Sequence, residues 1–303
     1  MSANKIEFYS LKEDPDLWEQ LIEAENQASA TDVKAREVVE SMYWETDRAL
    51  AFQRYLESLD FQQIDELMRV FRISRKHPLC EIGGGSGQLA WSLVKSGFQQ
   101  VELLEPNPRW ITGTAWLETQ VTGLDGALTI CNSLDAWYAD EKVYHTIVTR
   151  NCVHHFPNIP MTAAAIRQKI KKGGHWVMIR EWYADTPAEL RMQMRNHPYC
   201  QKYGVYEFPF PARHYIGSLE YAGFRLRSVV PSGWGNNALS SYTRTAGSIW
   251  NQRLSKLWRL AFKKLPKLTV ILYRLEDSFN RVLGTRFRSF TRPQMMIFQR
   301  VES

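Results

Sequence analysis

Three ionisable side chains follow short apolar segments that we expect to form β-strands. His154 and His155 come after residues 146–150, and Glu181 comes directly after residues 175–180. In open α/β sheets ligands bind beyond the carboxyl ends of the parallel strands, so these side chains should meet at one edge. Imidazole and carboxylate groups can take a proton from a reacting molecule. They are the candidate catalytic residues, although a histidine there can instead cap the next helix and Glu181 can instead hold an arginine.

A glycine-rich loop, Glu81-Ile82-Gly83-Gly84-Gly85-Ser86-Gly87, stands between an apolar segment and an amphipathic helical pattern. Glycines allow a sharp turn and let a ligand approach the backbone amides at the start of a helix. The dinucleotide fingerprint requires G-x-G-x-x-G, but Gln88 breaks that spacing. A P-loop is excluded because no Gly-Lys-Ser/Thr follows. The loop therefore indicates a ligand site that is not a pyrophosphate cradle.

Glu105 stands 18 residues beyond Gly87, at the end of the next apolar segment. A carboxylate in that position can accept hydrogen bonds from both hydroxyls of a ribose. The pairing of the glycine loop with this acid predicts a ligand that contains a nucleoside.

Short apolar segments alternate with amphipathic ones from residue 77 onward, which is typical of a parallel sheet with helical crossovers. We expect strands over residues 78–82, 100–104, 127–131, 146–150, 175–180, 224–230 and 293–300, and helices over residues 88–96, 163–171 and 211–221. Gly173 and Gly174 should close the second of these helices. The predicted fold class is α/β: a Rossmann-like, doubly wound, mainly parallel seven-stranded sheet, with N-terminal helices and a helical insertion before the last strand.

The loop and its acid partner resemble those of the class I S-adenosylmethionine-dependent methyltransferases. Their E/D-x-G-x-G-x-G pattern is matched by Glu81, Gly83, Gly85 and Gly87, with Gly84 inside it. The resemblance implies that this loop faces the methionine part of S-adenosylmethionine. It also implies that Glu105 and Pro106 lie at the ribose, and that S-adenosylhomocysteine is the product.

The resemblance continues to residue 230. Asn132 and Ser133 follow the third expected strand, where the family holds the adenine with an acid-containing pair, so Asn stands here in place of the usual Asp. Residues 149–156, Thr-Arg-Asn-Cys-Val-His-His-Phe, are similar to the family's segment ending in "LHH", which implies a cofactor contact by Thr149. Lys172-Gly173-Gly174 resembles the "KPGG" turn, with Lys for Pro, and Ala222-Gly223-Phe224 resembles the "AGF" segment.

Tyr203, Tyr206 and Glu207 fall between the fifth expected strand and the next helix, where the family builds its acceptor pocket. The resemblance makes them candidate substrate-binding residues, the alternative being packing of a cap. Methyl transfer needs an acceptor positioned in line with the sulfonium, and a base where the acceptor starts protonated. No pattern in the sequence calls for a metal ion, so none is expected.

The basic residues are concentrated at the end of the chain. Residues 241–303 hold 13 Lys and Arg against 3 Asp and Glu, whereas the other 240 residues hold 25 against 29. Apolar residues recur at helical spacing between these cations over residues 250–265 and 272–283. A helical cap with a solvated basic face, a surface for an anionic membrane or lipid acceptor, and a site for a phosphorylated acceptor or RNA all fit this pattern. The candidate contact region is residues 250–292.

We divide the sequence into an N-terminal helical lid (1–76), the S-adenosylmethionine-binding core (77–230), a basic helical insertion or cap (231–292) and the last strand of the sheet (293–303). The four cysteines are widely spaced, which excludes a CxxC zinc cluster and a disulfide framework and fits a reducing cytoplasm. We see neither a signal peptide nor a transmembrane segment. The expected location is cytoplasmic, with membrane-peripheral contact as the variant.

The sequence thus predicts an S-adenosylmethionine-dependent methyltransferase whose partner is a small-molecule acceptor, a biosynthetic intermediate methylated on O, N or C. The alternatives are an RNA or lipid methyltransferase that uses the basic insertion, and a non-catalytic nucleotide-binding protein of the same fold. Nucleic acid is the less favoured partner because no RNA-binding module is recognisable. The pattern carries no signal for the oligomeric state.

Overall fold

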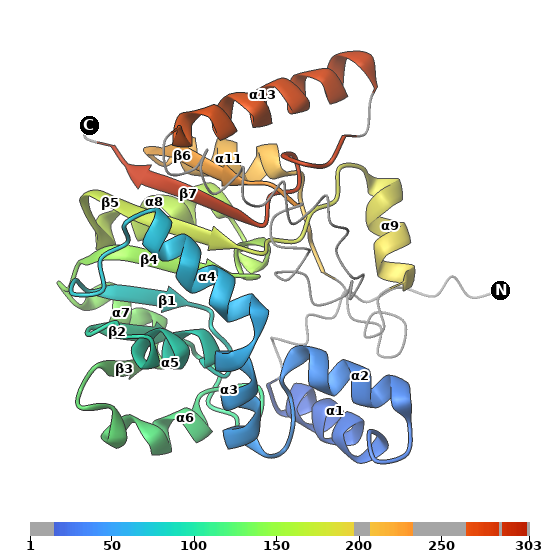
Figure 1. Ribbon diagram of the computed structural model, residues 1–303, viewed down its shortest axis with the longest axis vertical. Helices are drawn as coiled ribbons and strands as arrows, with labels where there is room; N and C mark the ends of the chain where they lie inside the picture. The colour runs from blue at the N-terminus through green and yellow to red at the C-terminus, as the bar shows by residue number, and fades with distance from the viewer. Residues whose placement is uncertain (1–14, 197–206, 233–264, 285–286, 302–303) are drawn as a thin grey trace.

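The computed structural model describes residues 15–196, 207–232, 265–284 and 287–301. Seven strands in these ranges form one sheet in the order β3-β2-β1-β4-β5-β7-β6 (Figure 1). The strands are β1 (Leu79–Ile82), β2 (Val101–Leu104), β3 (Leu128–Cys131), β4 (Tyr144–Arg150), β5 (Ile170–Ile179), β6 (Phe224–Val230) and β7 (Met295–Arg300). β1 to β5 pair in parallel, and β7 is antiparallel to both β5 and β6. The predicted fold class is confirmed.

Helices cover both faces of the sheet, and further helices lie beyond the carboxyl ends of its parallel strands. They are α1 (Pro15–Ala28), α2 (Val33–Met42), α3 (Arg48–Glu57), α4 (Leu59–Val70), α5 (Gln88–Lys95), α6 (Ala115–Gln120), α7 (Leu134–Ala139), α8 (Ile159–Lys169), α9 (Pro187–Asn196), α11 (Ala212–Tyr221) and α13 (Pro266–Leu283), with short 3-10 turns η2 (Val121–Leu124) and η3 (Val153–His155). One buried apolar cluster joins α3, α4 and α5 to the sheet, and a second joins α8, α11 and α13 to it. The sheet is therefore the middle of three layers.

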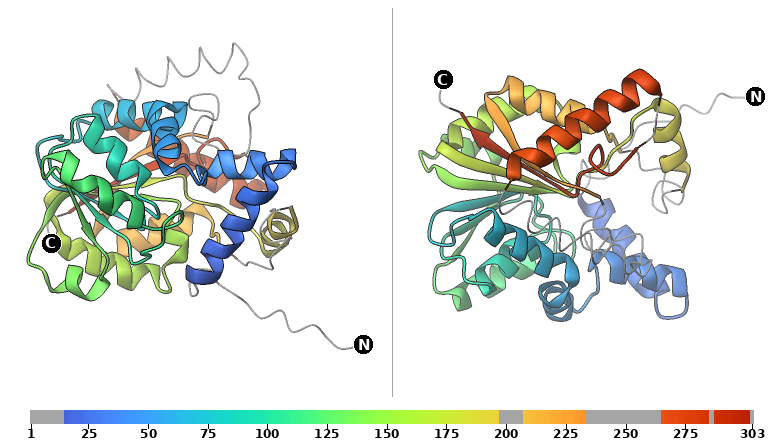
Figure 2. Two further views of the ribbon diagram at one scale, coloured as in Figure 1. Left: turned by 90° about the horizontal axis from the view of Figure 1, so that it is seen from below. Right: turned by 45° about the horizontal axis from the view of Figure 1, so that its top comes forward.

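The four N-terminal helices divide into two pairs. Phe52 and Tyr55 of α3 and Ile64 of α4 are buried in the cluster that also contains Leu79 of β1 and Leu93 of α5. In contrast, α1 and α2 pack on one another and stand beyond the ends to which the arrowheads of β1, β4 and β5 point (Figures 1 and 2). The sequence assigned all residues before 77 to a lid, but α3 and α4 share their core with the sheet.

The junction of α8 and β5 differs from the sequence prediction. Asn158 caps α8, accepting a hydrogen bond from the amide of Met161, so the helix starts one turn earlier than the expected residue 163. It ends at Lys169, and the glycine pair that was expected to close it lies inside β5. The pairing register shifts at this point. Tyr144 pairs with Ile170, but Thr146 pairs with His175, so a step of two residues in β4 matches a step of five in β5. A Cβ on Gly174 would meet the carbonyl oxygen of His145 at 2.7 Å, which explains why glycine is needed.

The C-terminal part contributes α13 and β7. α13 packs on β6 through its buried Thr269 and Tyr273, and it forms the upper edge of the molecule in Figure 1. It corresponds to the second basic amphipathic segment of the sequence, whereas most of the first, residues 250–264, lies outside the described residues. Among the described helices, none is long and apolar enough to cross a bilayer.

Candidate functional site

A cavity of about 1230 Å³ lies beyond the carboxyl ends of β1, β2, β4 and β5. Its wall includes the glycines at residues 83–85, Glu105, both candidate histidines and side chains from α1, α2 and α9. Ligand pockets in proteins usually measure about 300–1,000 Å³. The cavity therefore has room for two ligands side by side, such as a cofactor and an acceptor.

The glycine loop turns so tightly that side chains cannot replace its first glycines. Gly83 has a φ of 67°, in the left-handed region, and a Cβ there would stand 2.3 Å from the sulfur of Cys152. A Cβ on Gly84 would meet side chains of Leu103 and Glu81 at 2.6 and 2.7 Å. The backbone of the loop is thereby packed against the sheet behind it, with its other side bordering the cavity.

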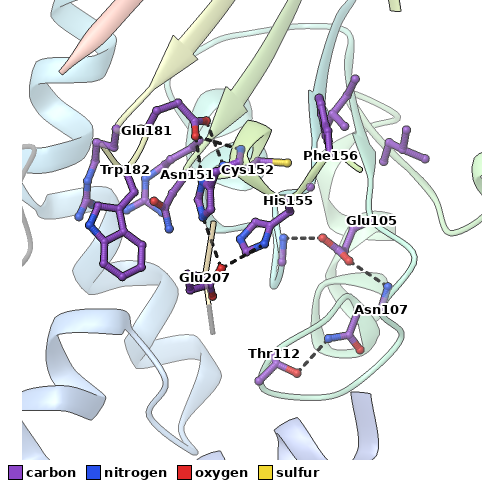
Figure 3. A pocket seen from close by; sticks show the side chains of 18 of the residues that line it. Glu105, Asn107, Thr112, Asn151, Cys152, His155, Phe156, Glu181, Trp182 and Glu207 are labelled. Atoms are coloured by element: carbon purple, nitrogen blue, oxygen red, sulfur yellow. Dashed lines mark hydrogen bonds and ion pairs between the residues drawn. The ribbon is translucent and has the colours of Figure 1, made fainter. Parts of the chain in front are cut away.

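Glu105 is fixed in orientation by the backbone around it. One carboxylate oxygen accepts the amide of Gly85 at 2.8 Å, and the other accepts the amide of Asn107 at 2.9 Å (Figure 3). The Asn107 side chain in turn donates to the Thr112 hydroxyl at 3.0 Å. Glu105 is half-buried and borders the cavity. This geometry suits a carboxylate that accepts hydrogen bonds from ligand hydroxyls.

At the opposite side of the cavity, Glu181 organises the turn after β4. Its carboxylate accepts hydrogen bonds from the amides of Cys152 at 3.1 Å, Val153 at 3.0 Å and His154 at 3.4 Å. It also accepts a hydrogen bond from Nδ1 of His154 at 2.9 Å. The side chain of Glu181 is fully buried. It therefore acts through His154: the carboxylate places the ring proton on Nδ1 and leaves the lone pair on Nε2.

His155 and Glu207 complete this side of the cavity. Oε2 of Glu207 lies 3.3 Å from Nδ1 of His155 and 3.8 Å from Nε2 of His154. The two imidazole rings lie 4.0 Å apart, measured between centroids. Figure 3 shows Glu207 below His155, on the side away from Glu181. The structure thus brings the two predicted histidines together with one of the three predicted substrate residues. Tyr203 and Tyr206 lie outside the described residues.

Comparison with known proteins agrees with this geometry. A family model described as a methyltransferase domain matches residues 52–229, which is more than half of the chain. The chain belongs to this methyltransferase family. It is a class I S-adenosylmethionine-dependent enzyme, as the sequence predicted. No curated protein matches the sequence significantly.

Three solved structures resemble this methyltransferase, each with a TM-score under 0.5. A geranyl diphosphate methyltransferase in complex with S-adenosylmethionine is 11% identical, with a TM-score of 0.48, over 85% of this chain and 92% of its own. Magnesium protoporphyrin IX methyltransferase from Synechocystis is 14% identical, with a TM-score of 0.43, over 56% and 74%. The YcgJ protein from Bacillus subtilis is 12% identical, with a TM-score of 0.46, over 80% and 99%. These likenesses concern the fold alone.

Some residues predicted to bind the cofactor do not line the cavity of the methyltransferase. Glu81 is buried and accepts the amide of Ala90 at 2.7 Å, so it holds the start of α5 under the loop. Burial raises the pKa of the Glu81 carboxyl to about 7; Glu105 adds to the rise, whereas Arg150 and the Ala90 amide oppose it. Gly87 is the N-cap residue of α5, with a φ of 79°. Both residues support the loop from behind.

The predicted cofactor contacts by Asn132, Ser133 and Thr149 remain predictions, and the structure shows the present partners of these residues. The Asn132 amide donates to Glu118 at 2.7 Å, and the Ser133 hydroxyl caps α7 by accepting the amide of Ala136. Thr149 is fully buried, and its hydroxyl accepts the indole N–H of Trp176 at 3.0 Å. None of the three is among the residues that line the cavity. Gly83, Gly84, Gly85, Glu105 and Pro106 do border the cavity.

A buried ion cluster that borders the cavity was not predicted from the sequence. Asp60 of α4 accepts hydrogen bonds from Arg150 at 2.9 Å and Arg180 at 3.3 Å. Both arginines border the cavity at the ends of β4 and β5, and Arg150 also lies over the ring of Tyr55, 5.0 Å from its centroid. Coulombic attraction to Tyr55, Asp60 and Glu81 overcomes the opposing effect of burial and raises the pKa of Arg150. The guanidinium group of Arg150 is therefore permanently charged.

The N-terminal helices supply an apolar wall that the sequence analysis also missed. Trp18 of α1, Met42 of α2 and Trp44 border the cavity, as does Trp182 next to Glu181. No local pattern marks these side chains as part of a ligand site, and only the tertiary structure brings them to one cavity.

Glu19 fastens α1 to the loop that follows β2. Its carboxylate accepts the amides of Ile111 at 2.6 Å and Thr112 at 3.0 Å, and the hydroxyl of Thr112 at 2.8 Å. Glu19 is only 9% exposed. The helix that carries Trp18 and the loop that carries Glu105 and Asn107 are therefore held together at the cofactor side of the cavity.

Proposed function

We propose that this methyltransferase binds S-adenosylmethionine against the glycine loop and Glu105, and transfers its methyl group to a small molecule held beside His154 and His155. The observation that carries the proposal is that the glycine loop, Glu105 and the histidine pair all border one cavity. A cofactor on one side and an acceptor on the other would meet inside it without crossing a protein wall. That juxtaposition is what an in-line displacement requires.

The cofactor side fits a nucleoside ligand with a charged amino-acid tail. The backbone of residues 83–85 borders the cavity, and Glu105 is already oriented by two amides. In the proposed binding mode, Glu105 accepts hydrogen bonds from the ribose hydroxyls and the loop lies along the methionine part. S-adenosylmethionine would supply a methyl carbon bonded to its sulfonium sulfur. After methyl transfer, the rest of the cofactor would leave as S-adenosylhomocysteine. The chain's own residues hold the cofactor and orient it.

The histidine side handles the acceptor's proton. Glu181 keeps the proton of His154 on Nδ1, so the Nε2 lone pair faces the cavity and Glu207. An acceptor hydroxyl or amine bound there would give its proton to Nε2 as its oxygen or nitrogen bonds to the methyl carbon. Glu181 is the positioning residue and His154 the catalytic one.

The lining indicates the acceptor's chemical class. Aromatic and thioether side chains dominate the wall between the histidines and the N-terminal helices: Trp18, Met42, Trp44, Phe156, Trp182 and Met192. The two arginines nearby are already paired with Asp60. We therefore expect a largely apolar, flat small molecule that carries one hydroxyl or amine group.

Calorimetry with S-adenosylhomocysteine tests the cofactor half. We expect binding in the micromolar range, about 100-fold weaker for Glu105→Ala and unchanged for the exposed-surface control Glu141→Ala. Failure of the natural protein to bind S-adenosylhomocysteine, together with tight binding of another nucleotide, would overturn the proposal. It would favour a non-catalytic nucleotide-binding protein.

The acceptor half is tested with S-adenosylmethionine carrying an isotopic methyl label and a panel of phenols, aromatic amines and apolar alcohols. Label should pass to members of this panel and not to RNA. Transfer to RNA alone would refute the small-molecule assignment.

A second role concerns the outer face of α13, and we propose that this face contacts an anionic membrane. Exposed apolar side chains recur on it at intervals of three and four residues: Leu268, Ile271, Leu275, Phe279 and Val282. The sequence around the helix is strongly basic, with 13 Lys and Arg against 3 Asp and Glu over residues 241–303. An apolar face with nearby cations is the combination that binds anionic lipid surfaces.

Sedimentation with vesicles of phosphatidylserine and phosphatidylcholine tests this role. Binding should be present at low salt and reduced at high salt. The double variant Ile271→Ser/Phe279→Ser should bind at least about 5-fold less, as buried apolar area is lost. Tyr221→Ser is the control, because Tyr221 is 93% exposed but lies on α11. No sedimentation at either salt concentration would remove the membrane role.

A further inference from the structure

Three side chains that commonly ligate metals converge on the histidine side of the cavity. Ligand atoms of His154, His155 and Glu207 all lie within 4.8 Å of one another. His155 and Glu207 are half-buried and His154 is buried, and all three border the cavity. The histidines come from the turn after β4 and Glu207 from the segment before α11, so the cluster is formed only by the fold.

The spacing of these atoms is closer to that of a ligand set than to that of a hydrogen-bonded group. Two atoms bound to one ion at about 2.1 Å each, at angles between 90° and 109°, stand about 3.0–3.4 Å apart. Oε2 of Glu207 is 3.3 Å from Nδ1 of His155 and 3.8 Å from Nε2 of His154. A charge-assisted N–H···O bond has a shorter length of about 2.7–2.9 Å. The Glu207–His155 distance already lies in the range of a metal-ligand pair, and the Glu207–His154 distance exceeds it by a few tenths of an ångström.

The support behind His154 is the kind that metal-ligating histidines have. Its Nδ1 donates to Glu181 at 2.9 Å, and Glu181 is anchored by three consecutive backbone amides. Such a carboxylate fixes the tautomer and the ring orientation and makes the opposite nitrogen a better ligand. Nε2 of His154, the opposite nitrogen, is the atom that faces Glu207.

We propose that His154, His155 and Glu207 bind a divalent transition-metal ion at the acceptor side of the cavity. Two imidazole nitrogens with one carboxylate oxygen favour ions such as Zn²⁺, Mn²⁺, Fe²⁺ or Co²⁺ over Mg²⁺ and Ca²⁺, which prefer oxygen ligands. The two carboxylates, Glu207 at the ion and Glu181 behind His154, balance its double charge. Three protein ligands leave open positions on the cavity side. The sequence analysis expected no metal ion, because no ligand pattern in the chain places Glu207 beside the histidines.

The chemical role of the metal ion rests on the proposed function, because the ion would act on the same acceptor. An acceptor hydroxyl bound at an open position would lose its proton to water at lower pH than in solution. The oxygen then gives an electron pair to the methyl carbon, the carbon–sulfur bond breaks, and its pair stays on sulfur as the neutral thioether. With the ion bound, His154 serves as a ligand and no longer takes the proton.

Titration of Co²⁺ into untagged, chelator-treated full-length protein tests the site. We expect one equivalent to bind and to give the visible absorption of a nitrogen-ligated Co²⁺, and one equivalent of Zn²⁺ to displace it. Affinity should fall at least about 100-fold in His155→Ala/Glu207→Gln, and about 10-fold or more in Glu181→Gln, through loss of the support to His154. His77→Ala, an exposed histidine distant in sequence from the site, should leave the titration unchanged.

Each variant is also titrated with S-adenosylhomocysteine and melted thermally, so that a folding failure is recognised. Single variants His155→Asn and Glu207→Gln replace the double one if it unfolds. Less than one tenth of an equivalent of bound Co²⁺ in the folded natural protein would overturn the metal site, as would equal affinity in the ligand variants. If S-adenosylhomocysteine still binds in that case, the proposed function stands and only the metal fails. Stoichiometric Co²⁺ without S-adenosylhomocysteine binding would support the metal site and overturn the proposed function.

Discussion

The cofactor side and the histidine side of the cavity differ in how far apart in the chain their parts lie. The cofactor side is built within one strand, loop, helix and strand, between Gly83 and Glu105. The histidine side needs Glu181 from the end of β5, Glu207 from before α11 and Asp60 from α4. Short-range geometry can be recognised as a local pattern, whereas a site assembled from distant segments exists only in the folded chain.

The two sides also differ in what holds them. Around Glu105 the partners are mostly backbone amides of the neighbouring turns. Around His154 the partners are the charged side chains of Glu181 and Glu207. Variants of Glu105 should therefore change ligand affinity, and variants of His154 should change reaction rate.

The largest effect that separates the two sides is expected for His154→Ala. Loss of its Nε2, as proton acceptor or as metal ligand, should lower kcat about 10²–10⁴-fold on an acceptor from the panel. S-adenosylhomocysteine affinity should stay within about 2-fold, because His154 lies on the acceptor side. Calorimetry and steady-state kinetics on the same preparation measure both. Equal losses of rate and of cofactor affinity would show that the sides are not separate.

The next effect concerns stability. Asp60→Asn leaves Arg150 and Arg180 without their shared buried carboxylate, and Asp60 is only 6% exposed. Removing one partner of a buried ion pair costs about 3–5 kcal/mol of unfolding free energy. Urea denaturation measures the change, with the exposed Asp135→Asn as the matched control. A loss of unfolding free energy below about 1 kcal/mol would contradict a stabilising role of the buried Asp60 ion pairs.

Glu81 gives the cofactor side a pH dependence. Its folded pKa of about 7 lies above the ordinary 4.5, so the folded state favours the protonated carboxyl. Ionisation therefore costs stability as the pH rises from 4.5, and the full cost, about 3 kcal/mol, is present above pH 7. Glu81→Gln should stabilise the protein by about that amount at pH 8 and hardly at all at pH 4.5. Parallel pH profiles of unfolding for the two proteins would refute this expectation.

The smallest effect tests the point where the two sides touch. Gly83→Ala places a methyl group 2.3 Å from the sulfur of Cys152 and a side chain at a φ of 67°, and should cost about 2 kcal/mol. Cys152→Ala in the same chain removes the sulfur, so the double variant should recover about half of the loss. The remainder is the cost of the left-handed backbone. Additive losses in a double-mutant cycle, followed by urea denaturation, would mean that this contact is unimportant.

Much of the fold and half of the site could be predicted from the sequence. All seven strands lie where apolar segments indicated them, and Glu105 and the glycines at residues 83–85 border the cavity as expected. These features are encoded by neighbours in the chain. The predicted start of α8 was wrong because Asn158 caps the helix earlier. The prediction that Gly173 and Gly174 end the helix was also wrong, because these residues lie at a register irregularity of β5.

The remaining features depend on tertiary contacts that no local pattern reveals. Thr149 is fully buried, and its hydroxyl accepts a hydrogen bond from Trp176 on the neighbouring strand. No local pattern marks Asp60, yet it joins two strand-end arginines. Glu181 was predicted as a candidate catalytic residue, but the sequence does not show that its fully buried carboxylate is bonded to Nδ1 of His154.

The carboxylate of Glu19 has a consequence for the timing of turnover. It bonds Ile111 and Thr112 at once, from a helix whose Trp18 borders the cavity. Moving α1 outward would expose a buried charge and two backbone amides together, so the three bonds should break in one step. Exchange of spent cofactor for fresh would then follow a two-state opening rather than gradual breathing. The dwell time of the product would be set by a side chain that touches neither reactant.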